Sequence, residues 1–182
     1  AATRQGDGPW QLDLAGDGPY GATFAAGAQA GAGPLSADLQ ARLPNIAPLV
    51  PRFSGALALE ASVQQPEAGA PLQVTADAAL PYGASAEVTG RVGEGAGRLR
   101  FALGMPDIAP IARGLSGSLR ITGTATERPE GWALDVQTAG PGAAAASVTG
   151  VLAPGGATSL RAQGTAPLGL VNGLLAPQRL DG

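Results

Sequence analysis

The sequence predicts an all-β protein: a repetitive curled sheet of about three units of roughly 62 residues, each with about four strands and a short proline-containing helical turn. Three observations support this prediction. A phrase returns at a fixed spacing, apolar and polar residues alternate between its copies, and glycine and proline fall at repeating positions. The fixed period is considered first, because it decides the architecture before any single residue does.

The clearest repeat is a short phrase rich in proline. Residues 44–48 read PNIAP, and residues 106–110, which lie 62 positions further along, read PDIAP. A looser third copy begins at Pro167. Residues 10–14, WQLDL, return about two periods later as residues 132–136, WALDV. Because 62 is an even number, matched strand residues keep the same face in successive units, and one apolar surface is expected to run through all of them.

The repeats also suggest how the chain is organised. Residues 2–4 (ATR) resemble residues 125–127 (ATE), at the tail of a fourth strand, and residues 181–182 stand just before the next fourth strand would begin. We therefore expect one repetitive β segment excerpted from a longer array. Its units are expected at about residues 10–71, 72–131 and 132–182.

Composition excludes several classes of protein. The chain has 29 glycines and 16 prolines but no cysteine and no histidine. Hydrophobic residues make up 45% of the chain and are placed periodically, which argues against intrinsic disorder. A net charge of −3 without a basic stripe makes nucleic acid an unsuitable partner. The absence of cysteine excludes disulfides and thiolate metal sites, and there is no apolar run of about 18 residues that would form a membrane-spanning helix.

Strands are expected where apolar and polar residues alternate, because side chains alternate between faces along a strand. The proline-rich phrase cannot be a central strand, since proline lacks the N–H that a ladder needs. One or two helical turns are expected there, at residues 46–50 and 108–113. The expected strands are at residues 10–14, 24–29, 39–43, 57–63, 72–74, 84–92, 99–103, 119–125, 132–136, 145–152 and 159–164.

No catalytic constellation is found. Residues 16–21 fit the dinucleotide pattern Gly-x-Gly-x-x-Gly, but a strand is expected next rather than the helix that a phosphate loop needs, so we interpret them as a turn. Without histidine, a serine nucleophile has no suitable base. Asp13 with Asp17, and Glu127 with Glu130, are possible acid–base pairs, and all four are expected on exposed faces or turns as solvated carboxylates. We expect no metal, no cofactor and no enzymatic activity.

The apolar surface is the remaining candidate site, and two interpretations of it stay open. In the first, its larger side chains form the packed core of a β solenoid or sandwich. In the second, alanine and glycine at many alternate positions leave too little bulk to fill an interior at native packing density. A long sheet curled into a trough would then leave this face partly open to an apolar ligand such as an acyl chain.

Three features resemble the TamB family of translocation and assembly module subunits, which is related to the AsmA-like and bridge-like lipid-transfer proteins. They are the proline-bearing turns between strands, the phrase Leu160-x-x-x-Gly164-x-Ala166-Pro167-Leu168, and the phrase Leu174-Leu175-Ala176-Pro177-x-Arg179-Leu180-x-Gly182. The resemblance covers the whole chain as an internal repeat segment. It implies a β-taco with a hydrophobic groove, in the periplasmic part of a protein whose inner-membrane anchor lies outside this chain.

The resemblance also implies a function. Proteins of this family conduct phospholipid between the inner and outer membranes and support the assembly of outer-membrane proteins such as autotransporters. Their partner is an Omp85-type, TamA-like barrel, which is contacted by other parts of the protein. The ligand would be phospholipid acyl chains, bound in proportion to buried apolar area at about 25 cal/mol per Å². The expected groove residues are Leu39, Leu43, Leu57, Leu59, Leu99, Phe101, Leu103, Leu119, Ile121, Leu134 and Val136.

The main alternative is structural: a β-solenoid spacer, or the stalk of an adhesin or autotransporter, with a filled, dry core and no lipid. Parallel solenoids repeat every 20 to 30 residues or so, and a unit of 62 residues with an internal proline-rich turn fits them less well. A hydrolytic enzyme is a more distant alternative.

Overall fold

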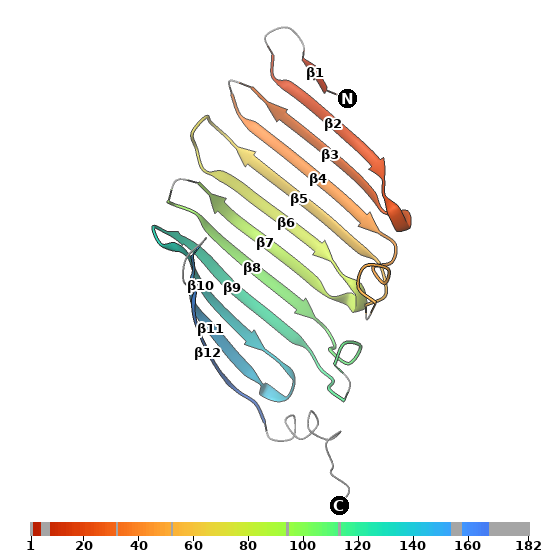
Figure 1. Cartoon of the computed structure of the whole chain (residues 1–182), viewed down its shortest axis with the longest axis vertical. Helices are drawn as coiled ribbons and strands as arrows, with labels where there is room; N and C mark the ends of the chain where they lie inside the picture. The colour runs from red at the N-terminus through yellow and green to blue at the C-terminus, as the bar shows by residue number, and fades with distance from the viewer. Residues whose placement is uncertain are drawn as a thin grey trace, which may run out of the picture.

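The strands of this protein form one antiparallel sheet (Figure 1). The computed structural model describes residues 2–4, 8–31, 33–51, 53–93, 95–112, 114–153 and 158–167. Within these residues, twelve strands lie across the sheet in the order of the sequence, so that each strand pairs with the strands before and after it. The prediction of an all-β fold is confirmed.

Every stretch where a strand was expected lies in or overlaps an observed strand. Most of the observed strands are longer than the stretch of alternating residues from which they were predicted. The strands are β1 (Ala2–Arg4), β2 (Trp10–Asp17), β3 (Thr23–Ala30), β4 (Leu35–Leu43), β5 (Leu57–Gln65), β6 (Leu72–Ala79), β7 (Ser85–Val92), β8 (Arg98–Met105), β9 (Leu119–Arg128), β10 (Gly131–Ala139), β11 (Ala145–Leu152) and β12 (Ser159–Thr165).

The sheet is open and uncurled, whereas the sequence predicted a curled β-taco. β1 and β12 lie at opposite ends of the sheet (Figure 1) and do not pair with each other. The ladders between neighbouring strands run residue by residue without a bulge, for example from Trp132↔Leu152 to Ala139↔Ala145 between β10 and β11. Bulges are the usual device that bends a sheet. The curl is the part of the fold prediction that the structure corrects.

Three short 3₁₀ turns connect neighbouring strands, all at the same end of the strands: η1 (Pro19–Gly21), η2 (Pro81–Gly83) and η3 (Pro141–Ala143). Proline suits the first position of each turn because its φ is already fixed and its missing N–H is not needed there. The second residue of each turn has a φ of 62°, and it is tyrosine in η1 and η2 but glycine in η3.

The two proline-rich phrases form loops between strands, residues 44–56 after β4 and residues 106–118 after β8. In the first loop the Val50 N–H donates to the Ile46 C=O at 3.0 Å, which makes a single helical turn. Pro51 disfavours a helical conformation at Val50, so the turn does not continue. In the second loop the Ala112 N–H donates to the Ile108 C=O at 2.8 Å. Each loop thus has one helical turn where one or two were expected, at 46–50 and 108–113, and Arg113 lies outside the described residues.

The second loop builds the main buried cluster of the described residues. Ile108 is 7% exposed and packs with Met105, the last residue of β8, and with Ala84, which directly precedes β7. The partly buried side chains around this cluster are Leu80, Ala112, Leu115 and Leu119. The proline-rich loop therefore folds over one end of the strands. No large side chain in the described part of the chain is fully buried.

The connections recur every four strands. η1, η2 and η3 follow β2, β6 and β10, and the proline-rich loops follow β4 and β8. The division into units at 10–71, 72–131 and 132–182 stays a prediction. The third copy of the phrase from residue 168 onward, and the TamB-like phrase at 174–182, lie outside the described residues.

Candidate functional site

The register of the ladders gives the sheet one apolar face. Directly opposed residues on neighbouring antiparallel strands point to the same side of a sheet. Val136 is opposite Val148 on β11 and Gly123 on β9, and Gly123 is opposite Phe101 on β8. Followed from strand to strand, this row contains Leu14, Ala26, Leu39, Ala61, Ala76, Val88, Phe101, Gly123, Val136, Val148 and Ala162. It crosses eleven strands without a polar side chain.

All eleven residues expected to line a groove lie on this face, in four neighbouring rows. Leu43, Leu57 and Leu119 are nearest the proline-rich loops, and the next row holds Leu59, Leu103 and Ile121. The two rows further from the loops hold Leu39, Phe101 and Val136, and then Leu99 and Leu134.

The list of expected groove residues omitted several residues of the same face, although Leu12, Leu14 and Val63 lie in stretches where strands were expected. The even spacing within each strand was the signal that could have found them. They include Leu12, Leu14, Val63, Val74, Val88, Val148 and Leu160.

The opposite face is polar. Asp135, for example, is opposite Thr124 on β9 and Thr149 on β11, and Arg100 is opposite Thr89 on β7. The charged residues of this face include Asp13, Asp38, Glu60, Asp77, Glu87, Arg91, Arg98, Arg100, Arg120 and Arg161. The two faces are therefore as different as those of a sheet that packs on only one side.

The apolar face has large side chains lying over small ones. A β-carbon at Gly123 would lie 2.5 Å from the Cζ of Phe101, so the ring occupies the space that a side chain on β9 would need. Phe24 covers Gly16 in the same way, with a corresponding distance of 2.8 Å. An aromatic ring that covers a glycine on the neighbouring strand fills the space above it and makes the surface flatter. Substitution of Gly123 would displace the Phe101 ring.

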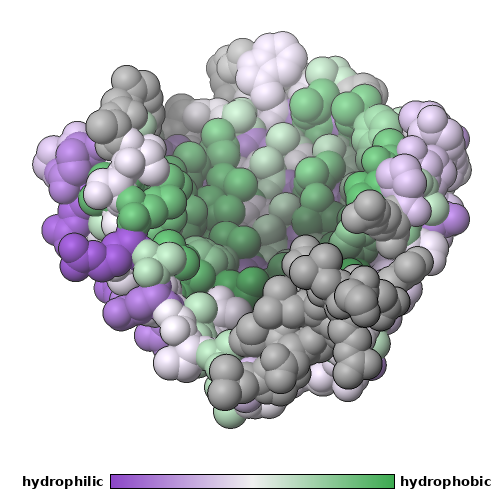
Figure 2. Space-filling model, turned by 60° about the horizontal axis from the view of Figure 1, so that its bottom comes forward, coloured by the Kyte–Doolittle hydropathy of each residue, from purple (hydrophilic) through white to green (hydrophobic). Residues whose placement is uncertain are grey.

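No second layer covers this face in the described part of the chain. Trp10, Leu14 and Leu160 are each 52% exposed, and side chains of the central strands such as Leu99 and Val136 are partly exposed. Figure 2 shows a hollow lined by hydrophobic residues. An uncovered apolar surface of this continuity is a feature of binding surfaces rather than of ordinary exposed residues.

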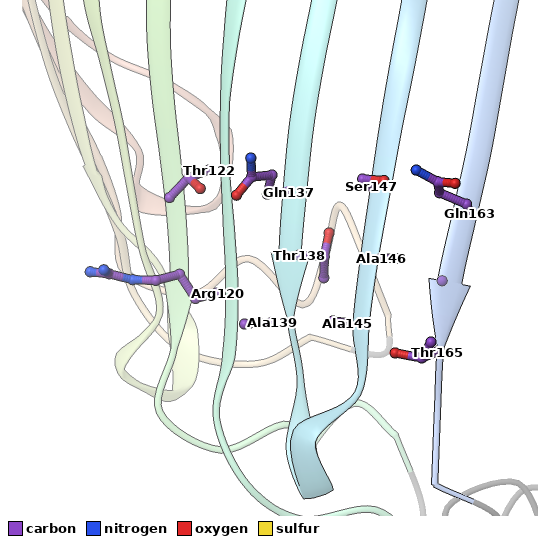
Figure 3. A pocket seen from close by; sticks show the side chains of 11 residues that line it. Arg120, Thr122, Gln137, Thr138, Ala139, Ala145, Ala146, Ser147, Gln163 and Thr165 are labelled. Atoms are coloured by element: carbon purple, nitrogen blue, oxygen red, sulfur yellow. The ribbon is translucent and has the colours of Figure 1, made fainter.

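Hollows also exist on the polar face. One of about 580 Å³ lies over β9 to β12 (Figure 3), where Thr122, Gln137, Ser147 and Gln163 form one row. Its lining has hydroxyls, amides and the Arg120 guanidinium but no carboxylate. It therefore offers hydrogen bonds to a ligand but no general base for a hydrolytic reaction.

A second polar hollow contains an acidic row. Glu60, Asp77 and Glu87 are directly opposite one another on β5, β6 and β7, and line a hollow of about 420 Å³. Like charges in direct opposition destabilise a sheet pair. No group of three or more acidic, histidine or cysteine side chains among the described residues is arranged to hold a metal ion. The row is a solvated feature of the polar face.

The two pairs of carboxylates considered for acid–base chemistry do not form a site. Asp13 and Asp17 lie on the polar face four residues apart on β2, which separates them by about 13 Å, too far for a pair acting on one bond. Glu127 is a correction: it was expected to be exposed and solvated, but it lies half-buried on the apolar face. Its Oε2 accepts a hydrogen bond from the Gly97 N–H at 2.9 Å. Glu130 is exposed in the turn between β9 and β10.

Residues 16–21 form the end of β2 and the η1 turn, and β3 follows at Thr23. A phosphate loop would need a helix at that point.

Among the described residues two side chains have shifted pKa values, Asp107 in the second proline-rich loop and Tyr82 in η2, which is hydrogen-bonded to Ser54 of the first loop. The pKa of Asp107 is lowered by the Gly117 N–H and then by the Ala109 N–H, which both donate to its Oδ1. The pKa of Tyr82 is lowered by its hydrogen bonds with the Ser54 hydroxyl and the Ser54 N–H. These bonds fix the loops at the end of the sheet rather than forming a reactive centre.

In the described residues no helix is long and apolar enough to cross a membrane. Comparison with models of protein families, with curated proteins and with solved structures finds no match to this chain.

Proposed function

We propose that the apolar face of this sheet holds the acyl chains of phospholipids, and that the chain is one segment of a lipid conduit. One observation carries the proposal: rows of apolar side chains cross the sheet from strand to strand and nothing in the described residues covers them. A face of this kind must be covered by something apolar in water, and an acyl chain meets that need without a specific partner group.

The chemistry of the face suits movement along it. Acyl binding is non-directional and worth about 0.8 kcal/mol for each CH₂ group removed from water. The row through Phe101 has no polar side chain that would hold a lipid at one point. A lipid tail can therefore pass from one strand to the next with similar affinity at each step. No single residue of the face is expected to be essential.

The size of the face is consistent with a path rather than a pocket. Twelve strands enclose eleven spacings of about 4.8 Å, so the face extends about 53 Å across the sheet. The hydrocarbon core of a bilayer is about 30 Å thick. This proposal places the segment in the periplasm of a Gram-negative envelope, in a protein of the TamB type that carries phospholipid between the two membranes and supports outer-membrane protein assembly. An Omp85-type barrel would be contacted by other parts of that protein.

Photo-crosslinking in cells tests the proposal with residues that are adjacent in sequence but lie on opposite faces. A photoreactive amino acid is placed in turn at Leu134, Val136, Asp135 and Gln137 of β10. The expected result is phospholipid adducts at 134 and 136 and none at 135 and 137. Lipid adducts at all four positions would contradict the assignment of the faces. Adducts only to protein at 134 and 136 would contradict the lipid proposal and support the structural spacer, whose apolar face is covered by a protein layer.

A further inference from the structure

The two margins of the apolar face, at the two ends of the strands, are built differently. Because the strands alternate in direction, every second connection lies at the same margin. One margin, which we call the loop margin, holds η1, η2, η3 and the two proline-rich loops, 44–56 and 106–118. The other, the hairpin margin, holds the connections between β5 and β6, β7 and β8, and β9 and β10, among others.

The loop margin is apolar and closed. Met105 and Leu119 are directly opposite each other there, and the Ile108 side chain of the second loop packs against them. At the first loop Leu43 is opposite Leu57, and Leu43 is only 8% exposed. The structure describes five buried hydrophobic side chains, and four of them lie at this margin: Leu43, Ala84, Met105 and Ile108. A polar group placed here would lose its hydration and find no partner on the strands.

The hairpin margin of the same face carries polar atoms. Glu127 is opposite Trp132, and its carboxylate holds the Gly97 N–H. Gln65 donates from Nε2 to the Ala70 C=O at 2.8 Å. Arg4, which is opposite Trp10, and Glu127 are the charged side chains that the described strands place on the apolar face, and both lie at the hairpin margin. Thr138 is the one polar side chain that the described strands place on this face nearer the loop margin.

Two tryptophans mark the hairpin margin. Trp10 is at the start of β2 and Trp132 near the start of β10, and both lie in the outermost row of the apolar face. Trp132 packs over Gly97: a β-carbon at Gly97 would lie 2.8 Å from its Cη2. Tryptophan has a large apolar ring with one N–H donor, and it prefers boundaries between apolar and hydrated regions. The hairpin margin therefore has the composition of an interface, whereas the loop margin has that of a core.

We propose that an amphiphile on this face lies along the strands with one orientation: its polar headgroup at the hairpin margin and the ends of its acyl chains at the loop margin. This inference rests on the proposed function. The dimensions agree with it, because a strand of eight residues such as β6 spans about 26 Å. The tails of one leaflet occupy about 15 Å and the headgroup layer about 6 Å. One phospholipid thus fits across the sheet, and successive lipids would move sideways from strand to strand with their headgroups along one margin.

Two photoreactive phospholipids test the orientation on the unmodified protein. One phosphatidylethanolamine carries its diazirine at the end of an acyl chain, and the other carries it on the headgroup. After irradiation, the adducts are located by mass spectrometry and divided between the two margins. The tail probe is expected to label the loop margin, around positions 43, 57, 105 and 119. The headgroup probe is expected to label the hairpin margin, around positions 65, 72, 127 and 132, with a preference of about tenfold in each case.

Failure of this inference and failure of the proposed function give different results. If both probes label the two margins alike, or with the opposite preference, lipid binding stands and the orientation is overturned. If neither probe labels the apolar face, the proposed function falls and the orientation falls with it.

Discussion

The two proline-rich loops, residues 44–56 and 106–118, share backbone hydrogen bonds among their described residues and differ in the side chain that accepts two of their N–H groups. The Ile46 N–H donates to the Gly55 C=O at 2.9 Å, and the Ile108 N–H donates to the Gly117 C=O at 3.0 Å. In the first loop Asn45 accepts two backbone N–H groups, whereas in the second Asp107 does so.

The comparison teaches that the loop needs an acceptor at this position but not a charge. A neutral amide oxygen and a carboxylate oxygen bind the corresponding N–H groups at distances that differ by at most 0.2 Å, since Asn45 lies 3.1 Å from the Gly55 nitrogen and Asp107 lies 2.9 Å from the Gly117 nitrogen. The consequence of the difference is electrostatic. Among the described residues of the two loops, Asp107 is the group whose side-chain hydrogen bonds depend on its protonation state.

The largest expected effect comes from a feature that the loops share. Gly55 and Gly117 have φ angles of 123° and 115°, and a β-carbon at either would lie 3.2 Å from the Cβ of the first proline of a 3₁₀ turn, Pro81 of η2 or Pro141 of η3. Gly55→Ala and Gly117→Ala are each expected to destabilise the protein by about 1–3 kcal/mol, because alanine is strained at these angles. Urea unfolding measures the change in the free energy of unfolding.

Gly33→Ala is the control for these variants. Nothing lies within 4 Å of a β-carbon at Gly33, and the expected change is within about 0.5 kcal/mol. A large effect in one loop and none in the other would show that the two backbones are not equivalent.

The next effect is pH dependence in the second loop alone. The folded-state pKa of Asp107 is lowered by the Gly117 and Ala109 N–H groups, so its contribution to stability is present above the unfolded-state pKa of about 3.9 and is lost as the pH falls through the folded-state value. In an NMR titration the amide signals of Ala109 and Gly117 are expected to shift in this acidic range. Those of Ala47 and Gly55 are expected to stay constant, because Asn45 does not titrate.

The reciprocal pair Asp107→Asn and Asn45→Asp sharpens this prediction. The first substitution should remove the acid titration from the second loop, and the second should introduce it in the first loop. Persistence of the Gly117 titration in Asp107→Asn would assign the shift to another group.

A smaller effect distinguishes the turns that follow the loops. The Tyr82 hydroxyl in η2 accepts the Ser54 N–H at 3.1 Å and lies 3.1 Å from the Ser54 Oγ, while η3 has Gly142 at the corresponding position. Ser54→Ala is expected to raise the pKa of Tyr82 towards about 10, because the side-chain donor is the larger cause of its lowered value. Spectrophotometric titration of the tyrosines measures this change.

The chain has one other tyrosine, Tyr20, which occupies the same position in η1 with the same φ of 62°. Tyr20→Phe leaves Tyr82 as the one tyrosine that the measurement records, and the effect of Ser54→Ala is measured in that background. An unchanged pKa of Tyr82 in Ser54→Ala would show that the Ser54 hydroxyl is not the cause of its lowered value.

Much of this architecture could be predicted from the sequence. The alternation at residues 10–14 and 99–103, together with an even period, placed the strands and put Leu99, Phe101 and Val136 on one face. Side chains alternate between the two faces along any strand, so the face of each residue can be predicted without knowledge of the tertiary structure.

Other features could not be read in this way. Tyr20 and Tyr82 adopt a φ of 62°, which a tyrosine rarely does, so nothing in the sequence announced η1 and η2 as 3₁₀ turns. The burial of Ile108 and the position of Glu127 on the apolar face depend on which connection meets which margin of the sheet. The expected curl depends on bulges, which have no clear signal in a sequence with glycine throughout.

The central claim is that the apolar face holds phospholipid, and one matched pair of variants tests it most directly. Val136→Asp and Gln137→Asp introduce the same charge at neighbouring positions of β10, the first on the apolar face and the second on the polar face. The measurement is the phospholipid that co-purifies with each protein, quantified by mass spectrometry and compared with the unsubstituted chain after both variants are shown to be folded. The account predicts bound lipid in the unsubstituted chain, an unchanged amount in Gln137→Asp and a severalfold loss in Val136→Asp. Equal amounts of lipid in the two variants, or none in the unsubstituted chain, would contradict it.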